Sequence, residues 1–356
     1  MIKKILNSII TDYWKFRIRS FYLIIRNGFN LSFPDTKLIS VNKKNVHFEI
    51  ENSSNNQINN TDLIFSTDSG IFILLSSENK TIQILEGKIY GLCYHKGYWI
   101  FSRSNNYTKS NQINDKSKRQ SDICAIKILG TEVVDYKILI WGIVGEVHQI
   151  DVFKNSLYFP VTGFNLLVNI PMGELFLNDK PISKPKTFFS LKSQVELKIF
   201  RPSHLNSIFY SKLTDNIYLI AHNSTAHTNR NSDIIVIHNN NRSSIINTTA
   251  HSSHNIYEMN DGETLIYCDS NNRKLMMGNL CLFESDTLLR GLAITESSIF
   301  VGGSDIDFIG NKRMSSNCFI YQITKDGDLV KKIKFFNLGN IKEVRVYNGK
   351  DYGLSL

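Results

Sequence analysis

The chain of 356 residues has only five cysteines, and no two of them form a CxxC pair. Scattered single cysteines exclude zinc ribbons and CxxC redox sites, and they favour a reducing compartment. Cys93 and Cys268 each lie inside an apolar strand pattern, which is typical of small core residues. The sequence therefore predicts a cytoplasmic location.

Long apolar runs and common catalytic motifs are also absent. No run of 18 apolar residues exists, so an ordinary membrane-spanning helix is excluded. The chain has no P-loop, no GxGxxG after a strand, no HExxH and no GxSxG. Only residues 13–26 combine basic and aromatic side chains, so the sequence does not favour nucleic-acid binding. The net charge of +9 indicates either an anionic partner or a generally basic surface.

The chain contains six copies of one sequence motif, called the repeated phrase below. Each copy has a leading polar or aromatic residue, an apolar strand, a turn, a second apolar strand and a polar exit. The leading residues are Tyr90, His148, His204, His254, Arg290 and Glu343. The hairpin recurs every 36 to 58 residues, which is typical of a propeller blade. The sequence therefore predicts an all-β fold, a six-bladed β-propeller. In the first two copies the alternation of apolar and polar residues is irregular, so the sequence also allows seven blades.

The two ends of the pattern predict how the ring closes. The last phrase, residues 343–356, supplies two strands, and residues 63–88 supply the apolar strands that this blade lacks. Pairing of 63–88 with 343–356 would leave no unpaired strand edges where the ring closes. We therefore divide the chain into residues 1–61, with a helix, short strands and a polar linker, and the propeller at residues 62–356.

Residues 1–28 predict an N-terminal helical extension. Ile2, Ile5, Leu6 and Ile9 recur at helical spacing, and basic residues outnumber the single acid, Asp12. Two interpretations stay open. The helix packs its apolar face on the propeller, or it lies in the surface of an anionic membrane and makes the protein a peripheral membrane protein.

The repeated phrase resembles six-bladed propellers of the gluconolactonase, strictosidine-synthase and NHL-repeat kind. The resemblance covers residues 62–356 and implies the fold alone. The acidic and Asn metal ligands of the lactonases cannot be matched residue by residue in this chain. The Trp-Asp and Gly-His signatures of WD40 propellers are absent.

The leading residues predict a site at one mouth of the central channel. In a propeller the first strand of each blade lines the channel, and it begins at the mouth where the second strand ends. Three neutral imidazoles there predict a divalent metal, Zn, Mn or Fe, held by His148, His204 and His254. The candidate ligand-binding residues are Arg290, His222, Asn206 and Asn255. The candidate catalytic residues are Asp269 and Asp305.

Two classes of function follow from these residues. The first is binding of a small polar anionic ligand, a sugar or glycan, or metal-assisted lyase or hydrolase chemistry on it. A metal-free pocket and a purely structural role for the histidines stay open within this interpretation. The second class is a non-catalytic scaffold that contacts a protein, or a membrane through residues 1–28. The sequence leaves open whether the protein is an enzyme.

Overall fold

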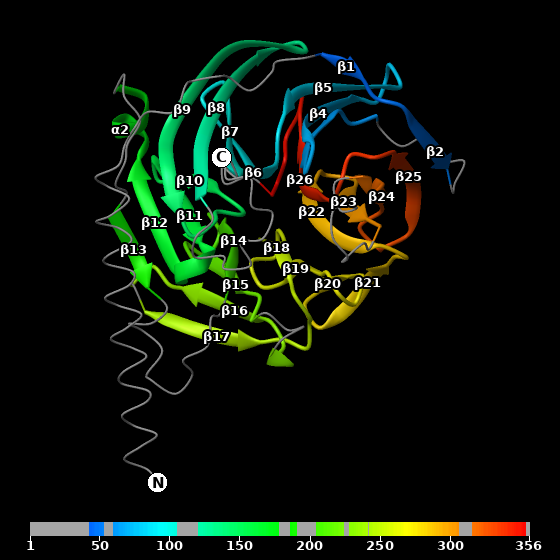
Figure 1. Ribbon diagram of the computed structural model, residues 1–356. Helices are drawn as coiled ribbons and strands as arrows, with labels where there is room; N and C mark the ends of the chain where they lie inside the picture. Colours follow the sequence, from blue (N-terminus) through cyan, green and yellow to red (C-terminus); the bar gives the residue numbers. More distant parts are fainter. Residues whose placement is uncertain are drawn as a thin grey trace. The chain divides into compact units, whose positions relative to one another are not determined.

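The computed structural model describes residues 43–52, 60–104, 120–177, 186–190, 204–223, 228–240, 242–305 and 315–353. Within these residues the strands form six antiparallel sheets (Figure 1). The prediction of an all-β six-bladed propeller is confirmed. The predicted helical extension, residues 1–28, lies outside the described residues.

The first four blades each consist of four strands in chain order from the inner strand outward. Blade 1 contains β6 (Ile89–His95), β7 (Tyr98–Ser104), β8 (Gln120–Leu129) and β9 (Glu132–Val144). Blade 2 contains β10 (Asp151–Phe153), β11 (Ser156–Val161), β12 (Leu166–Pro171) and β13 (Lys186–Ser190). Blade 3 contains β14 (Leu205–Tyr210), β15 (Ile217–Ala221), β16 (Asp233–Ile237) and β17 (Ser243–Asn247). Blade 4 contains β18 (His254–Glu258), β19 (Leu265–Asp269), β20 (Lys274–Met277) and β21 (Leu280–Glu284).

Blades 5 and 6 each have a fifth, outer strand from the N-terminal side of the described chain. Blade 5 contains β22 (Leu288–Ile294), β23 (Ile299–Ser304), β24 (Cys318–Ile323), β25 (Leu329–Phe335) and β2 (Phe48–Asn52). Blade 6 contains β26 (Ile341–Val346), β3 (Leu63–Thr67), β4 (Gly70–Leu75), β5 (Lys80–Glu86) and β1 (Lys44–Asn45). Residues 44–52, assigned from the sequence to the N-terminal segment, therefore add strands to two blades.

Blade 6 joins strands from both ends of the described chain. β26 pairs antiparallel with β3, with Val344 opposite Phe65. The sequence predicted two strands within 343–356, but the described part of this segment, residues 343–353, contains only the end of β26, after which the chain turns. Asp351 fixes that turn by accepting hydrogen bonds from the backbone N–H groups of Val346, at 3.0 Å, and Ile294, at 3.3 Å.

The hydrophobic core lies between neighbouring blades. Successive strand residues point to opposite sheet faces, so each blade offers apolar side chains to both neighbours. Phe65 of blade 6 stacks on Phe72 at 5.2 Å and packs against Phe335 of blade 5 at 4.9 Å. A short helix, α2 (Met172–Leu177), follows β12. Among the described residues, no helix has the length and apolar character needed to cross a bilayer.

Candidate functional site: a polar pocket where the inner strands begin

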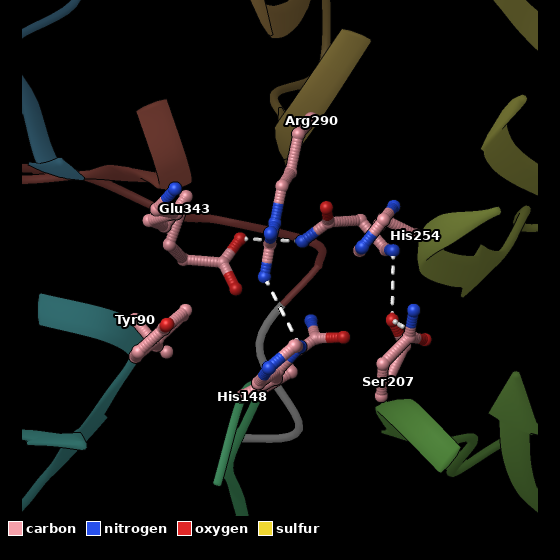
Figure 2. A pocket seen from close by; sticks show the side chains of 11 residues that line it. Tyr90, His148, Ser207, His254, Arg290 and Glu343 are labelled. Carbon is pink, nitrogen blue, oxygen red and sulfur yellow. Dashed lines mark hydrogen bonds between the residues drawn. The ribbon is translucent and has the colours of Figure 1, made fainter. Parts of the chain in front are cut away.

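A polar pocket lies where the six inner strands begin, and eleven residues line it (Figure 2). They occupy two consecutive positions at the starts of the inner strands. The first position, called the mouth ring below, consists of Tyr90, His148, Asn206, His254, Arg290 and Lys342. The position that follows it in sequence, called the second ring below, consists of Gly91, Gln149, Ser207, Asn255 and Glu343. Each blade therefore contributes one mouth-ring residue to the same small space.

Bulges at the starts of the inner strands turn these residues out of the regular ladder. The pairing register shifts between His254 and Ile256 in β18, which leaves Asn255 without a cross-strand partner. Register shifts of the same kind leave Asn206 in β14 and Lys342 in β26 without cross-strand partners. Inner strands β6 and β22 shift at the corresponding place. A bulge bends its strand and redirects a side chain, so repeated bulges direct polar groups to one centre.

Two of these bulges require a special backbone at the residue after the mouth ring. Asn255 has φ of 48° and Gly291 has φ of 87°, which is the left-handed region that Gly and Asn tolerate best. Gly91 meets a different constraint. A Cβ atom there would lie 2.5 Å from the carbonyl oxygen of His148 in the next blade. Glycine therefore permits the close approach of blades 1 and 2 beside the pocket.

A hydroxyl group from the preceding blade fixes the start of every inner strand. Ser66 donates to the carbonyl of Tyr90 at 2.5 Å, and Ser102 donates to the carbonyl of His148 at 2.9 Å. The other four contacts join Thr162 to Leu205, Ser232 to Ser253, Ser270 to Leu289, and Ser304 to Ile341. The mouth ring is thus held by its backbone, independently of what its side chains contact.

Two of the six leading residues predicted from the sequence are not the mouth-ring residues of their blades. In blade 3 the mouth-ring residue is Asn206, and His204 does not line the pocket. In blade 6 it is Lys342, and Glu343 belongs to the second ring. Aligning the copies on the apolar residue that follows the second ring, such as Ile208, places the leading residues correctly.

Four imidazoles pack against one another around this mouth. His204 meets the ring of His148 edge-on at 5.5 Å and stacks on His222 at 4.6 Å. His222 in turn meets His254 edge-on at 5.2 Å. Tyr90 stacks on the other side of His148 at 4.8 Å. The rings therefore contact one another through their faces and edges.

This arrangement does not fit the divalent metal predicted for His148, His204 and His254. The Nδ1 atom of His148 lies 3.4 Å from the guanidinium of Arg290, and its Nε2 lies 3.4 Å from a Glu146 oxygen. A guanidinium beside a ligand nitrogen repels a metal cation. Among the described residues, no group of three or more His, Cys, Asp or Glu is placed to hold a metal.

Acidic groups stand behind or below the mouth ring, which itself contains no acid. Asp68 lies 3.1 Å from the ammonium group of Lys342. Glu146 accepts a hydrogen bond from the Tyr90 hydroxyl at 2.6 Å, behind the ring that Tyr90 forms with His148. The groups that face the pocket from the mouth ring are therefore chiefly hydrogen-bond donors and bases.

Burial shifts the ionisation of two groups that line the pocket. The pKa of His254 lies well below its usual range, because burial and the nearby charge of Arg290 both disfavour the imidazolium. Burial also raises the pKa of Glu343 to about 7, although Arg345 and Arg290 oppose the shift. The pocket therefore contains a carboxyl group, that of Glu343, whose ionisation changes near neutral pH.

The side-chain amide of Gln149 provides a buried hydrogen-bond donor in the pocket. Its Oε1 accepts from the backbone N–H of Ile208 at 3.2 Å, while its Nε2 has no hydrogen-bond partner in the described part of the chain. The volume of the cavity is about 10 Å³. That is roughly what one water molecule requires, and far less than the 300 Å³ or more of a typical ligand pocket. Only one small group can enter.

The other predicted site residues divide between the pocket and its surroundings. Arg290, Asn206 and Asn255 line the pocket, as their assignment to ligand binding requires. His222 does not line the pocket, and its ring contacts His204 and His254. Neither candidate catalytic residue lines the pocket. Asp269 accepts from the backbone N–H of His251 at 2.7 Å, and Asp305 accepts from the amide of Asn317 at 2.9 Å.

The structure resembles solved six-bladed propellers, while the sequence matches no known protein family and no curated protein. A chain in the crystal structure of a nidogen/laminin complex matches 83% of this chain and 99% of its own length, with a TM-score of 0.57 and 10% identity. A gluconolactonase from Xanthomonas campestris matches 85% and 90%, with a TM-score of 0.53 and 7% identity. A structural-genomics target assigned to the gluconolactonases matches 72% and 80%, with a TM-score of 0.50 and 10% identity. The predicted resemblance to six-bladed propellers is confirmed at the level of the fold.

Proposed function

We propose that this protein binds a small anion, or the anionic group of a sugar, in the pocket where the inner strands begin. The composition of the mouth ring supports the proposal most directly. Arg290, Lys342 and two imidazoles surround the pocket, and no acid belongs to this ring. Basic and donor groups from different blades are what a carboxylate or phosphate needs for recognition.

Arg290 and Gln149 supply the contacts that an anion would make. A guanidinium presents a planar fork of N–H donors that matches a carboxylate better than the point charge of a lysine does. Gln149 Nε2 is a buried donor without a partner among the described residues, and leaving a donor unsatisfied costs about 1–3 kcal/mol. An anion oxygen between these side chains would use both, which favours binding.

D-gluconate is a suitable probe for this pocket. Two of the structurally similar propellers are described as gluconolactonases, and opening of a sugar lactone yields a sugar carboxylate. The pocket has room for about one small group. We therefore propose that the carboxylate enters between Arg290 and Gln149, and that the sugar hydroxyl groups stay at the opening.

The proposal requires no metal. The nitrogens of His148 and His254, which were expected to hold one, contact Arg290, Glu146 and Ser270 instead. We expect D-gluconate affinity to be the same before and after treatment with EDTA. A loss of affinity that Zn²⁺ or Mn²⁺ restores would favour the metal-assisted alternative.

Calorimetric titration tests the proposal. We expect the unchanged protein to bind sodium D-gluconate and acetate but not D-glucose, because glucose lacks the charge. Arg290→Met should weaken D-gluconate binding at least tenfold, and Arg290→Lys should weaken it less. Arg242→Met is the matched control, because Arg242 is exposed in the turn before β17. Equal affinity of the Arg290→Met variant and the unchanged protein would refute the proposal.

A non-catalytic scaffold is the second candidate function. Exposed apolar side chains on the outermost strands of two neighbouring blades favour it: Ile245 and Ile246 on β17, and Leu280 on β21. A chain of similar fold occurs in the nidogen/laminin complex. In this case Arg290→Met would leave the interaction with a partner protein unchanged, whereas Ile245→Ser with Ile246→Ser would weaken it.

A further inference from the structure

Glu343 is the one acid among the eleven residues that line the pocket, and only 1% of it is exposed. Its Oε1 accepts a hydrogen bond from the Asn255 amide at 2.9 Å, and its Oε2 lies 3.6 Å from the guanidinium of Arg345. Figure 2 shows Glu343 facing the part of the pocket into which Arg290 points. Its carboxylate therefore lies near Arg290, one of the donors that a bound anion would use.

Several ionisable groups around the pocket already lie beside an acid. Lys342 lies 3.1 Å from Asp68, Arg345 lies 3.6 Å from Glu343, and His148 lies 3.4 Å from Glu146. Arg290 already interacts electrostatically with Glu343, so an anion bound at Arg290 places a second negative charge near that carboxylate. A buried charge without compensation is costly, and uptake of one proton removes that cost.

Glu343 is better placed than His254 to take up this proton. The titratable and charged groups that face it from the surrounding elements are Arg290, Arg345, Asp351, Tyr257, Cys93 and Cys268. Burial raises the pKa of Glu343 to about 7, and a second negative charge nearby would raise it further. Burial and Arg290 hold the pKa of His254 well below its usual range, so protonation there is harder.

We propose that the pocket binds its anion together with one proton, and that Glu343 takes up this proton. This inference rests on the proposed function. The ionised Glu343 is then an internal competitor of the ligand, and its protonation frees the donors around the pocket. The ligand class narrows to monoanions such as sugar carboxylates, because each further negative charge would need another proton.

The experiment is titration calorimetry with sodium D-gluconate in two buffers of different ionisation enthalpy. The difference in apparent enthalpy gives the number of protons taken up per anion. We expect close to one proton at pH 8.0 and roughly half a proton at pH 7.0, because the free carboxyl group is then about half ionised. The dissociation constant should rise about tenfold per pH unit above pH 7.

Glu343→Gln keeps the shape of the side chain without the titrating group. Its affinity for D-gluconate should stay constant between pH 6.0 and 8.5, with no proton uptake. Glu258→Gln is the matched control. Glu258 is a buried glutamate on an inner strand, it does not line the pocket, and it accepts from Tyr218 at 2.6 Å. This variant should keep the pH dependence of the unchanged protein.

The possible outcomes separate the two proposals. Binding without proton uptake by the unchanged protein, or equal proton uptake by Glu343→Gln, overturns the role of Glu343 and leaves anion binding intact. Absence of D-gluconate binding at every pH from 6.0 to 8.5 overturns the proposed function, and this inference with it. If Glu343→Gln does not fold, absence of proton uptake by the unchanged protein still overturns the role of Glu343.

Discussion

Lys342 and Asp68 show how a single buried charge is held at the pocket. Their side chains are 0% and 1% exposed, and the ammonium group lies 3.1 Å from the carboxylate. Asp68 also accepts from the backbone N–H of Asn340 at 3.1 Å. Such a pair contributes little net stability, but loss of one partner leaves the other charge buried without compensation.

Lys342→Met should therefore lower the free energy of unfolding by about 3–5 kcal/mol. The double variant Asp68→Asn with Lys342→Met should recover part of that loss, because it removes the stranded carboxylate. Urea denaturation of the three proteins measures this. Lys332→Met is the control, since its partner Asp286 is largely exposed and such pairs contribute less than about 1 kcal/mol. A Lys342→Met protein as stable as Lys332→Met would contradict the prediction.

His254 should make the fold sensitive to acid. Its pKa is depressed in the folded protein, so below the ordinary histidine pKa of about 6.5 the unfolded chain binds a proton that the folded chain does not. Folding stability from this group is full above pH 6.5 and decreases as the pH falls, by up to about 1.4 kcal/mol at pH 5.5. His254→Gln should therefore lose less stability between pH 7.5 and 5.5 than the unchanged protein. Identical losses in urea denaturation would show that His254 is protonated in the fold.

The bulged start of the inner strand is the element that builds the site. It places a mouth-ring residue toward the pocket and lets the backbone of neighbouring blades approach closely. Gly91 in β6 has a closer contact than Gly291 in β22, because a Cβ atom at Gly91 would meet the carbonyl oxygen of His148 at 2.5 Å. Backbone atoms cannot move aside as a flexible side chain can.

Gly91→Ala should destabilise the protein by about 1–3 kcal/mol, because blades 1 and 2 must separate. The same separation should weaken D-gluconate binding, since His148 and Gln149 belong to the displaced segment. Gly130→Asn is the control: φ is 59° there, and no atom lies within 4 Å of a Cβ position. Thermal unfolding with calorimetric titration checks both effects. Normal stability of Gly91→Ala would show that the blades adjust without strain.

The sequence predicts the strands better than it predicts the bulges. Each inner strand carries alternating apolar residues, which is why six blades are visible in the sequence. A bulge inserts a residue that breaks this alternation, so the leading residue of blade 3 was placed at His204, two positions before Asn206. The direction of an imidazole depends on its neighbours in space, so contacts such as His148 with Arg290 were not predictable.

Long-range pairing explains the remaining differences. β2 lies on β25, with Phe48 opposite Phe335, but nothing in the short segment 48–52 indicates which sheet it joins. Lys342 was missed because its partner, Asp68, is in the first strand hairpin of the described propeller. Closure through residues 63–88 was easier to expect, since it follows from the need to cover sheet edges.

At the scale of the whole molecule, one strand both closes the ring and completes the pocket. β26 is the inner strand of blade 6, pairs with β3 and carries Lys342, Glu343 and Arg345. Arg345 is fully buried and donates to the carbonyl of Leu92 in blade 1 at 3.0 Å. The fold and the proposed site therefore depend on the same six residues.

A chain that ends after Asn340 should not fold cooperatively. It loses β26, exposes the edge of β3 and leaves blades 5 and 1 without the strand between them. A chain that ends after Gly353 keeps this strand and is the control. Near-ultraviolet circular dichroism during urea denaturation distinguishes the two. A cooperative transition in the shorter chain would show that five inner strands are sufficient.

Anion binding in the central pocket can be observed most directly by anomalous scattering. Crystals grown at pH 6 with sodium bromide should show an anomalous peak in the pocket, within hydrogen-bond distance of Arg290 and Gln149. Crystals of Arg290→Met under the same conditions should lack that peak but keep any bromide bound at the surface. A pocket without bromide in the unchanged protein, while surface sites are occupied, would contradict anion binding at the mouth ring.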